Sequence, residues 1–331
     1  MRKFEGYMKG VDFGGWISQC DHTKKHYDEF ITDEDFENVK NMGFDHIRVP
    51  VDYDLIETSE GDRIEENYKY IDYAIEMCRK YGLNMVLDLH RTPGYSFDPA
   101  HNEKGLFESE KYQNRFYNIW DEFAKRYSKN DDMLVFELLN EVTKKEYQPT
   151  WNEMIKKCIG MIREYSKDIK IIVGGYGNNS VEAVEALDMP YDDNVIYTFH
   201  FYEPLIFTHQ GAYWIDLMDT EFRCNFEMTY GEYEELSNKY LGQMHSSFDE
   251  FDKDKIIGEE YFETLLLKAI KVADERNVRL YCGEYGVIDR ADKKEAAKWF
   301  DMFNKFMNKY EIGSAVWNYK AMDFEIERKQ Y

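Results

Sequence analysis

Eight short apolar runs alternate with amphipathic stretches along nearly the whole chain, and this alternation limits the fold more than any other feature. Most runs are continuously apolar, which is typical of parallel strands covered on both faces. The expected strands are residues 10–16, 44–51, 84–90, 133–141, 170–175, 194–202, 279–286 and 313–319. The expected helices are residues 33–43, 67–82, 111–127, 151–166, 180–187, 261–277 and 293–310.

Alternating strands and helices are the pattern of βα units, and eight such units predict an α/β fold closed into a (β/α)8 TIM barrel. A doubly wound sheet is the competing fold. It would usually carry a glycine-rich phosphate turn after its first strand. The segment GGYGNNS, residues 174–180, lacks the GxGxxG spacing and follows the fifth strand, so the barrel is favoured.

No stretch resembles a linker, so we predict a single catalytic barrel domain over residues 1–331. A long acidic segment, about 207–258, follows the sixth strand and is too long for an unstructured loop. We expect it to form a helical or irregular subdomain over one end of the barrel. Only residues 320–331 follow the eighth strand, so the eighth helix is expected to be short or missing.

The formal net charge of −23 argues against nucleic acid and anionic membrane partners, which attract clustered lysine and arginine. The five cysteines form no CxxC pair, which disfavours a disulfide framework or a zinc ribbon. The first residues lack the apolar core of a signal peptide, and no segment approaches about 20 apolar residues. We expect a cytoplasmic protein, or a secreted one whose signal peptide has been removed.

Polar or aromatic side chains stand at or near the C-terminal ends of most of the expected strands. In (β/α)8 barrels the C-terminal ends of the strands form the active site. One such residue alone is usually solvated or structural, but buried polar groups cost about 1–3 kcal/mol each unless paired, so several on one rim predict a site. The candidates are Arg48, His90, Asn140, Glu141, His200, Tyr202, Glu284 and Trp317.

Glu141 and Glu284 are the most informative pair, because the fourth and seventh strands face each other across a ring of eight. Two facing carboxylates suit glycoside hydrolysis, in which one gives a proton and the other attacks while ionised. Arg48 would favour an ionised neighbour. Glu137 lies two pleats deeper, too deep to meet a polymer. No HxH or HExxH motif supports a metal, and we expect no cofactor.

The chain resembles glycoside hydrolase family 5, the cellulase family A, and in particular the clostridial endoglucanase C type. The likeness is carried by GVDFGGWISQ, GFDHIRVPVDY, VLDLHRTPG, FELLNEV, LYCGEYGVI and GSAVWNYKAMDFEI, and by the FHFYEP segment with the FTHQ that follows it. It implies that Glu141 is the general acid/base and Glu284 the nucleophile, with net retention. Arg91 departs from the pattern, because close relatives often carry a second histidine there.

The resemblance also implies roles for the remaining candidates. Arg48 and Tyr202 would bond Glu284, while Asn140 would bond the sugar 2-hydroxyl at the cleavage point. His90 and His200 would line the same subsite over the Trp317 floor. Further stacking aromatics are expected among Trp16, Phe207 and Trp214.

The expected function is a retaining endo-β-glucanase acting on β-1,4 or mixed β-1,3-1,4 glucan, in a protein that we expect to be a monomer. The alternatives are a β-mannanase or glucomannanase, or an exo-acting β-glycosidase on short oligosaccharides, with the same catalytic glutamates. A non-catalytic sugar-binding barrel is a fourth possibility, and the presence of both glutamates argues against it.

Overall fold

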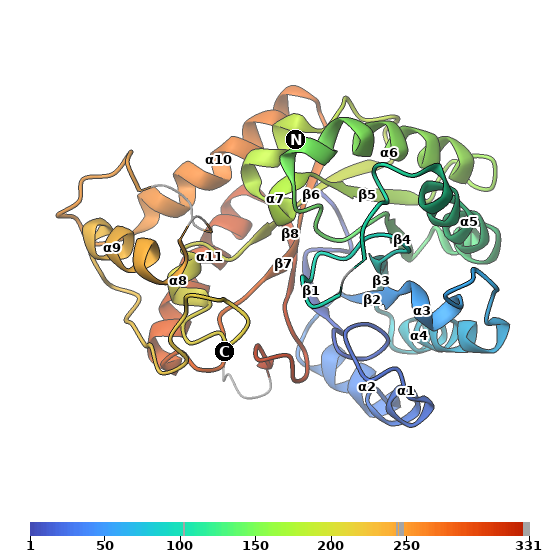
Figure 1. Cartoon of the computed structure of the whole chain (residues 1–331), viewed down its shortest axis with the longest axis horizontal. Helices are drawn as coiled ribbons and strands as arrows, with labels where there is room; N and C mark the ends of the chain where they lie inside the picture. The colour runs from blue at the N-terminus through green and yellow to red at the C-terminus, as the bar shows by residue number, and fades with distance from the viewer. Residues whose placement is uncertain (102, 243, 245–247, 327–331) are drawn as a thin grey trace.

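Eight parallel strands form a closed barrel in the computed structural model, which describes residues 1–101, 103–242, 244 and 248–326. They follow chain order, and β1 pairs with both β2 and β8, so the predicted (β/α)8 barrel is confirmed (Figure 1). The strands are β1 Lys9–Asp12, β2 His46–Asp52, β3 Asn84–Arg91, β4 Leu134–Glu137, β5 Lys170–Gly174, β6 Val195–Phe201, β7 Arg279–Tyr285 and β8 Gly313–Val316.

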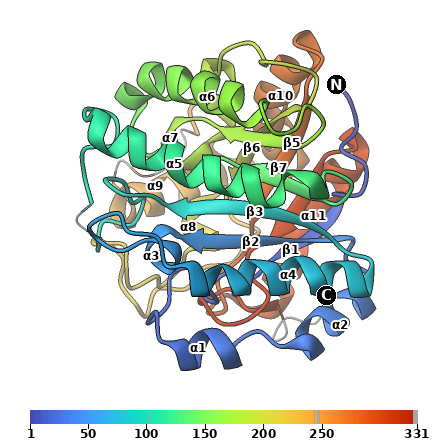
Figure 2. The ribbon, with the colours of Figure 1, turned by 90° about the vertical axis from the view of Figure 1, so that its right-hand side faces the viewer.

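Helices cover the outside of the barrel, as Figure 2 shows for α4 and α5 beside β2 and β3. Each main helix buries one apolar face against the strands; α5, for example, buries Trp120 and Phe123. None of the helices in the described residues is both long enough and apolar enough to cross a bilayer. The helices are α1 Lys24–Glu29, α2 Asp33–Asn41, α3 Tyr53–Ile56, α4 Tyr68–Tyr81, α5 Glu110–Tyr127, α6 Gln148–Ile162, α7 Tyr176–Asn179, α8 Leu205–Thr208, α9 Tyr230–Tyr240, α10 Glu259–Glu275 and α11 Lys293–Tyr310.

The amino end of the barrel is closed by a small apolar cluster. Phe4 and Tyr7, which precede β1, stack with ring centroids 4.4 Å apart and pack against the first residues of the strands. Charged side chains fill the barrel above this cluster, around the fully buried Arg48. The barrel is therefore closed at its amino end by these rings, beside which the buried His46 contacts the Tyr281 hydroxyl at 2.7 Å. The charged side chains around Arg48 lie farther toward the carboxyl ends of the strands.

The expected insert after the sixth strand is present and contains α8 and α9, with irregular chain between and after them. Both helices lie on one side of the barrel, away from α1–α4 (Figure 1). Viewed from the side, they lie toward the end of the molecule to which the arrowheads of β2 and β3 point (Figure 2). The insert is thus beside the carboxyl ends of the strands.

The short helix expected over residues 180–187 is a 3-10 helix, Val181–Ala186. Three expected strands, in contrast, end three or more residues early in the structure. β1 ends at Asp12 rather than at residue 16, and β8 ends at Val316 rather than at residue 319. β4 ends at Glu137, four residues before the predicted end. No α-helix follows β8 in the chain described up to residue 326, which agrees with the expected short or missing eighth helix.

Candidate active site

The buried guanidinium of Arg48 is the centre of the site. It donates from Nη1 to Asp12 Oδ1 at 2.9 Å and to Glu284 Oε1 at 2.8 Å. It also donates from Nε to Glu137 Oε2 at 2.6 Å and from Nη2 to Asn140 Oδ1 at 2.9 Å. A fourth carboxylate, Asp88, lies 3.0 Å from Nη2. One cation therefore links residues of β1, β3, β4 and β7.

Four carboxyl groups around one cation cannot all ionise without cost. Burial raises the pKa of Asp88 to about 7, although Arg48 opposes this shift. Burial also raises the pKa of Asp12 and of Glu137, again against the influence of Arg48. Burial therefore favours the protonated form of these three carboxyl groups, whereas Arg48 favours their ionised form.

Glu284 is aimed at the site by an irregularity in β7. The pairing of β7 with β8 shifts between Cys282 and Tyr285, and such a bulge redirects the side chain that it carries. Gly283 is needed there, because a Cβ atom would lie 2.9 Å from His200 Nε2. The Tyr202 hydroxyl donates to Glu284 Oε2 at 3.0 Å. Each carboxylate oxygen of Glu284 therefore accepts a hydrogen bond, Oε1 from Arg48 and Oε2 from Tyr202.

Glu141 follows a strand that has already ended. After Glu137 the chain leaves β4, although the backbone N–H of Asn140 still donates to the Leu89 carbonyl at 3.1 Å. Glu141 itself has φ 44°, in the left-handed region that non-glycine residues rarely adopt. Such strain persists where the surroundings hold the residue in place, often at functional sites. This turn explains why the predicted strand was too long.

The support for Glu141 comes from an unusual turn after β5. Gly177, Asn178 and Asn179 have φ values of 63°, 57° and 56°, all left-handed. The amides of Gly177 and Asn178 donate to the carbonyls of Thr143 and Val142, which fixes the turn against the chain that follows Glu141. As a result Asn178 Nδ2 donates to Glu141 Oε2 at 2.9 Å.

His200 bridges the same turn and Glu141. Its Nε2 lies 3.3 Å from Asn179 Nδ2, an amide donor, so Nε2 is the acceptor and Nδ1 carries the proton. Nδ1 then donates to Glu141 Oε1 at 2.8 Å. Burial lowers the pKa of His200 to about 4, against the influence of Glu284, so the ring is neutral at pH 7.

The two glutamates meet, as the sequence predicted. One oxygen of Glu141, one of Glu284 and a ring nitrogen of His200 all lie within 4.8 Å of one another. Burial raises the pKa of Glu141, whereas the Asn178 hydrogen bond and then the more distant His90 and Arg48 oppose the shift. The environments of the two carboxyl groups therefore differ, with neutral donors on Glu141 and a cation on Glu284.

A shelf of polar and aromatic atoms surrounds this pair. The rings of His90 and Trp317 are parallel within 3°, with centroids 5.8 Å apart. His90 Nδ1 contacts Asp88 Oδ2 at 2.6 Å, and burial, helped by Arg48, lowers the pKa of His90 to about 4. Within the described part of the chain, His90 Nε2 and Asn140 Nδ2 are buried without a hydrogen-bond partner. Both atoms can therefore bond ligand hydroxyls: Asn140 Nδ2 as a donor, and His90 Nε2 as a donor or an acceptor according to its tautomer.

Two of the three further aromatic candidates are wrong. Trp16 is fully buried and donates from its indole nitrogen to the Tyr27 carbonyl at 2.9 Å. Phe207 is also fully buried, in the core of the insert. Neither ring can meet a sugar. Trp214, in contrast, is 42% exposed.

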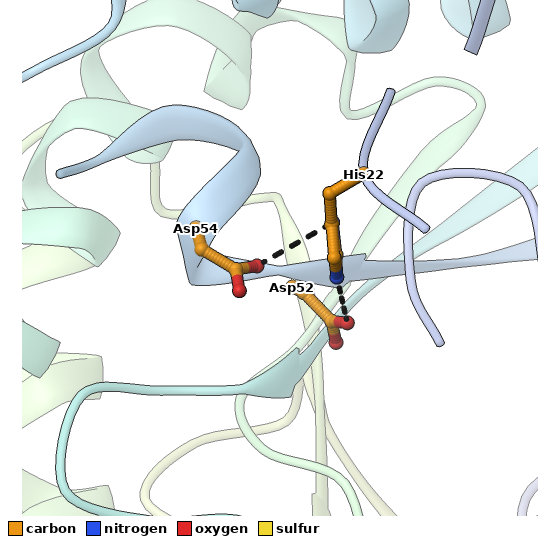
Figure 3. A group of neighbouring side chains, drawn as sticks. All are labelled: His22, Asp52 and Asp54. Atoms are coloured by element: carbon orange, nitrogen blue, oxygen red, sulfur yellow. Dashed lines mark ion pairs between the residues drawn. The ribbon is translucent and has the colours of Figure 1, made fainter. Parts of the chain in front are cut away.

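A second group of titratable side chains lies in the loop after β1 and at the junction of β2 and α3. Figure 3 shows His22 between Asp52 and Asp54, with ring nitrogens 3.6 and 3.7 Å from their carboxylates. Arg91, the residue that departs from the family pattern, contacts the same two carboxylates at 3.1 and 2.7 Å. A metal ion there would be repelled by this fixed cation, so we assign the group to an ion-pair network that holds the β1 loop.

Sequence reasoning missed Asp12, Asp88, Asn178 and Asn179. The two aspartates look like ordinary polar interruptions of apolar runs. The asparagines were considered only as part of an unsuitable phosphate loop. Consecutive Gly-Asn-Asn was a usable signal, because these residues tolerate left-handed backbone better than others.

Comparisons with known proteins cover the same span as the barrel. The sequence profile described as Cellulase (glycosyl hydrolase family 5) matches residues 9–323. Cellodextrinase A of Ruminococcus flavefaciens is 42% identical over 313 residues, 94% of this chain and 85% of that protein. Endoglucanase C of Acetivibrio thermocellus is 38% identical over 324 residues, 97% of this chain and 93% of that protein.

Solved structures agree with the fold. The endoglucanase Cel5A of the hyperthermophilic Thermotoga maritima aligns with a TM-score of 0.76 at 25% identity. The alignment covers 98% of this chain and 94% of that one. The similarity therefore extends over the whole barrel.

Proposed function

The chain belongs to glycosyl hydrolase family 5, and from this premise we propose that it is an endo-β-glucanase that cleaves β-1,4 or mixed β-1,3-1,4 glucan with net retention. The spacing of Glu141 and Glu284 carries the proposal. Oxygens within 4.8 Å suit direct attack by a carboxylate. An inverting enzyme separates its carboxyl groups by about 6.5–9.5 Å to admit a water molecule.

In the first step, Glu284 attacks the anomeric carbon while Glu141 protonates the departing glycosidic oxygen. Arg48 and Tyr202 stabilise the charged form of Glu284 until attack begins. Burial raises the pKa of Glu141, which favours the protonated form that an acid catalyst needs. The glycosidic bond breaks and a covalent ester to Glu284 forms, with inversion at the anomeric carbon.

In the second step, Glu141 acts as the base. It takes a proton from water, which attacks the anomeric carbon and displaces Glu284 as a carboxylate. The second inversion restores the original configuration. Asn140 Nδ2 donates to the sugar 2-hydroxyl and His90 Nε2 bonds a neighbouring hydroxyl, above the Trp317 ring.

Products from barley mixed-linkage β-glucan test this function directly. We expect the intact protein to release oligosaccharides of several lengths early in the digestion. Chromatography of later samples should show progressively shorter oligosaccharides. Glucose or a single dimer from the first minutes would instead identify an exo-acting enzyme on short chains. Cello-oligosaccharides belong in the same assay, because one relative is named a cellodextrinase and another an endoglucanase. No product from either substrate would contradict the proposal.

The alkaline side of the pH profile should report Glu141. Since the Asn178 hydrogen bond favours the carboxylate form of Glu141, Asn178→Ala is expected to raise its pKa further. An acid catalyst with a higher pKa stays protonated to higher pH. The alkaline limb of kcat/KM should therefore move upward in pH, and the acidic limb should stay in place.

Asn194→Ala is the matched control for this variant, because it removes an asparagine that donates to the Lys167 carbonyl just before β6, at the amino end of the barrel. Its pH profile should match that of the unsubstituted protein. An alkaline limb that moves downward, or that does not move, in Asn178→Ala would contradict the assignment of Glu141 as the acid.

A further inference from the structure

The side chain of Asn179 lies behind the His200 ring, at the nitrogen that does not contact Glu141. Asn179 ends α7, is fully buried and has a left-handed φ of 56°. Its amide occupies space that Gly174 of β5 leaves open, because a Cβ atom on Gly174 would lie 2.1 Å from Asn179 Oδ1. The turn and β5 therefore hold Asn179 Nδ2 in place, 3.3 Å from His200 Nε2.

The other ring nitrogen of His200 faces both glutamates. Nδ1 lies 2.8 Å from Glu141 Oε1 and 3.6 Å from Glu284 Oε2. A neutral imidazole carries one proton, so a donor at Nε2 makes that nitrogen the acceptor and places the proton on Nδ1. Asn179 therefore selects, from the far side of the ring, the tautomer that His200 presents to Glu141.

The position of the His200 proton matters to an acid catalyst. Glu141 Oε1 accepts from His200 Nδ1, and Oε2 accepts from Asn178 Nδ2 at 2.9 Å. Both neighbours are donors, so neither can accept the proton that Glu141 carries as an acid. If the His200 proton were on Nε2 instead, Nδ1 would be an acceptor 2.8 Å from the acid and would hold its proton.

We propose that Asn179 is a positioning residue for acid catalysis: its amide keeps His200 a donor toward Glu141, which leaves the proton of Glu141 free for the departing oxygen. The inference rests on the proposed function and adds to it a residue that acts on the acid through a histidine. The proton budget is unchanged, because the proton still passes from Glu141 to the glycosidic oxygen as that bond breaks.

Replacing Asn179 by aspartate tests the inference, because the new carboxylate accepts from His200 Nε2 with little change of shape. The ring then presents an acceptor to Glu141, or takes a second proton and leaves Glu141 ionised, and both states weaken the acid. A phenoxide needs a proton as it departs, whereas 2,4-dinitrophenoxide departs without one. In Asn179→Asp, kcat/KM for phenyl β-cellobioside should fall by about 100-fold, the lower range of what a general acid contributes, and that for 2,4-dinitrophenyl β-cellobioside by less than about threefold.

Asn179→Gly is the second variant, because glycine adopts left-handed backbone readily and adds no buried charge. Its loss should be smaller than that of Asn179→Asp and again confined to the phenyl substrate. Asn277→Asp is the matched control, since Asn277 also has a left-handed φ, 47°, but is exposed just before β7 at the amino end of the barrel. It should leave both rates unchanged. In folded Asn179 variants, equal losses on the two substrates, or no loss on either, would overturn the inference.

NMR of protein labelled at its histidine nitrogens separates the inference from the proposed function. Nitrogen chemical shifts show which ring nitrogen of His200 carries the proton, and His200→Gln identifies the signals. We expect an unprotonated Nε2 in the unsubstituted protein and a protonated one in Asn179→Asp. If the unsubstituted protein hydrolyses neither cellobioside, the proposed function fails, and these signals still test the control of His200 by Asn179. A protonated Nε2 in the unsubstituted protein, or an Nε2 that stays unprotonated in both Asn179 variants, would overturn that control.

Discussion

Replacing Glu284 by glutamine is expected to lower kcat on an aryl β-cellobioside by at least about 10⁴-fold, because an amide cannot form the glycosyl ester. The side chain keeps its size and its contact with the Tyr202 hydroxyl, so the fold should persist. Initial rates of aryl alcohol release measure the loss. Calorimetric binding of cellotetraose, unchanged within a few-fold, would separate lost chemistry from lost binding.

The matched control is Glu275→Gln, an exposed glutamate at the end of α10. It should be fully active. A Glu284→Gln protein with native circular dichroism and more than about one-hundredth of the original kcat would contradict the nucleophile assignment.

Azide can distinguish the two glutamates, because each variant leaves a different face of the sugar open. In Glu284→Gly, azide replaces the nucleophile and displaces the leaving group once, giving the α-glycosyl azide. In Glu141→Ala, Glu284 still forms its ester with an activated substrate, and azide then displaces it to give the β-glycosyl azide. NMR determines the anomeric configuration of each azide. A β-azide from Glu284→Gly and an α-azide from Glu141→Ala would show that the two glutamates have the opposite roles.

Removing the central cation is expected to have the largest effect on stability. Arg48→Met leaves Asp12, Asp88, Glu137 and Glu284 buried without their cation. Breaking a buried charge network in this way costs about 3–5 kcal/mol of the free energy of unfolding. Urea denaturation followed by tryptophan fluorescence measures the change. Arg79→Met, which removes an exposed pair with Asp132, should cost no more than about 1 kcal/mol.

The loss in the free energy of unfolding caused by Arg48→Met, called the deficit below, should also depend on pH. Burial raises the pKa of Asp88, Asp12 and Glu137 above their unfolded values, and losing Arg48 raises them further. Groups whose folded pKa is raised stabilise the fold fully below their unfolded pKa, and this contribution is lost as pH rises through the folded pKa. The deficit should therefore be small near pH 4 and grow toward pH 8. A deficit independent of pH would show that lost packing, not charge, causes it.

The barrel and its rim could be predicted because both follow from local patterns. Continuous apolar runs determine parallel strands, and parallel strands bring their carboxyl ends together, so Glu141, Glu284 and Arg48 meet. The route of the chain to Glu141 could not be predicted, because Leu138 and Leu139 are as apolar as strand residues and yet lie beyond the end of β4. Apolarity reports burial, not backbone direction.

The supporting residues were harder to predict for a different reason. Asn178 and Asn179 act through left-handed backbone that depends on contacts with Thr143 and Val142, more than thirty residues away in sequence. Trp16 and Trp214 look alike in sequence, and only the packed structure distinguishes a core ring from an exposed one. Tertiary contacts decide both cases.

The members of the Arg48 network are synthesised at different times. A ribosome releases Asp12, Arg48, Asp88 and Glu137 in that sequence, all within the first half of the chain, and Glu284 only near its end. A domain folds largely as a unit, and this barrel cannot close before β7 and β8 have emerged. A chain halted before β7 therefore contains the structural partners of Arg48 but leaves one Arg48 donor without its acceptor, Glu284. Translation therefore completes the barrel and supplies the proposed nucleophile, Glu284, in the same final stretch.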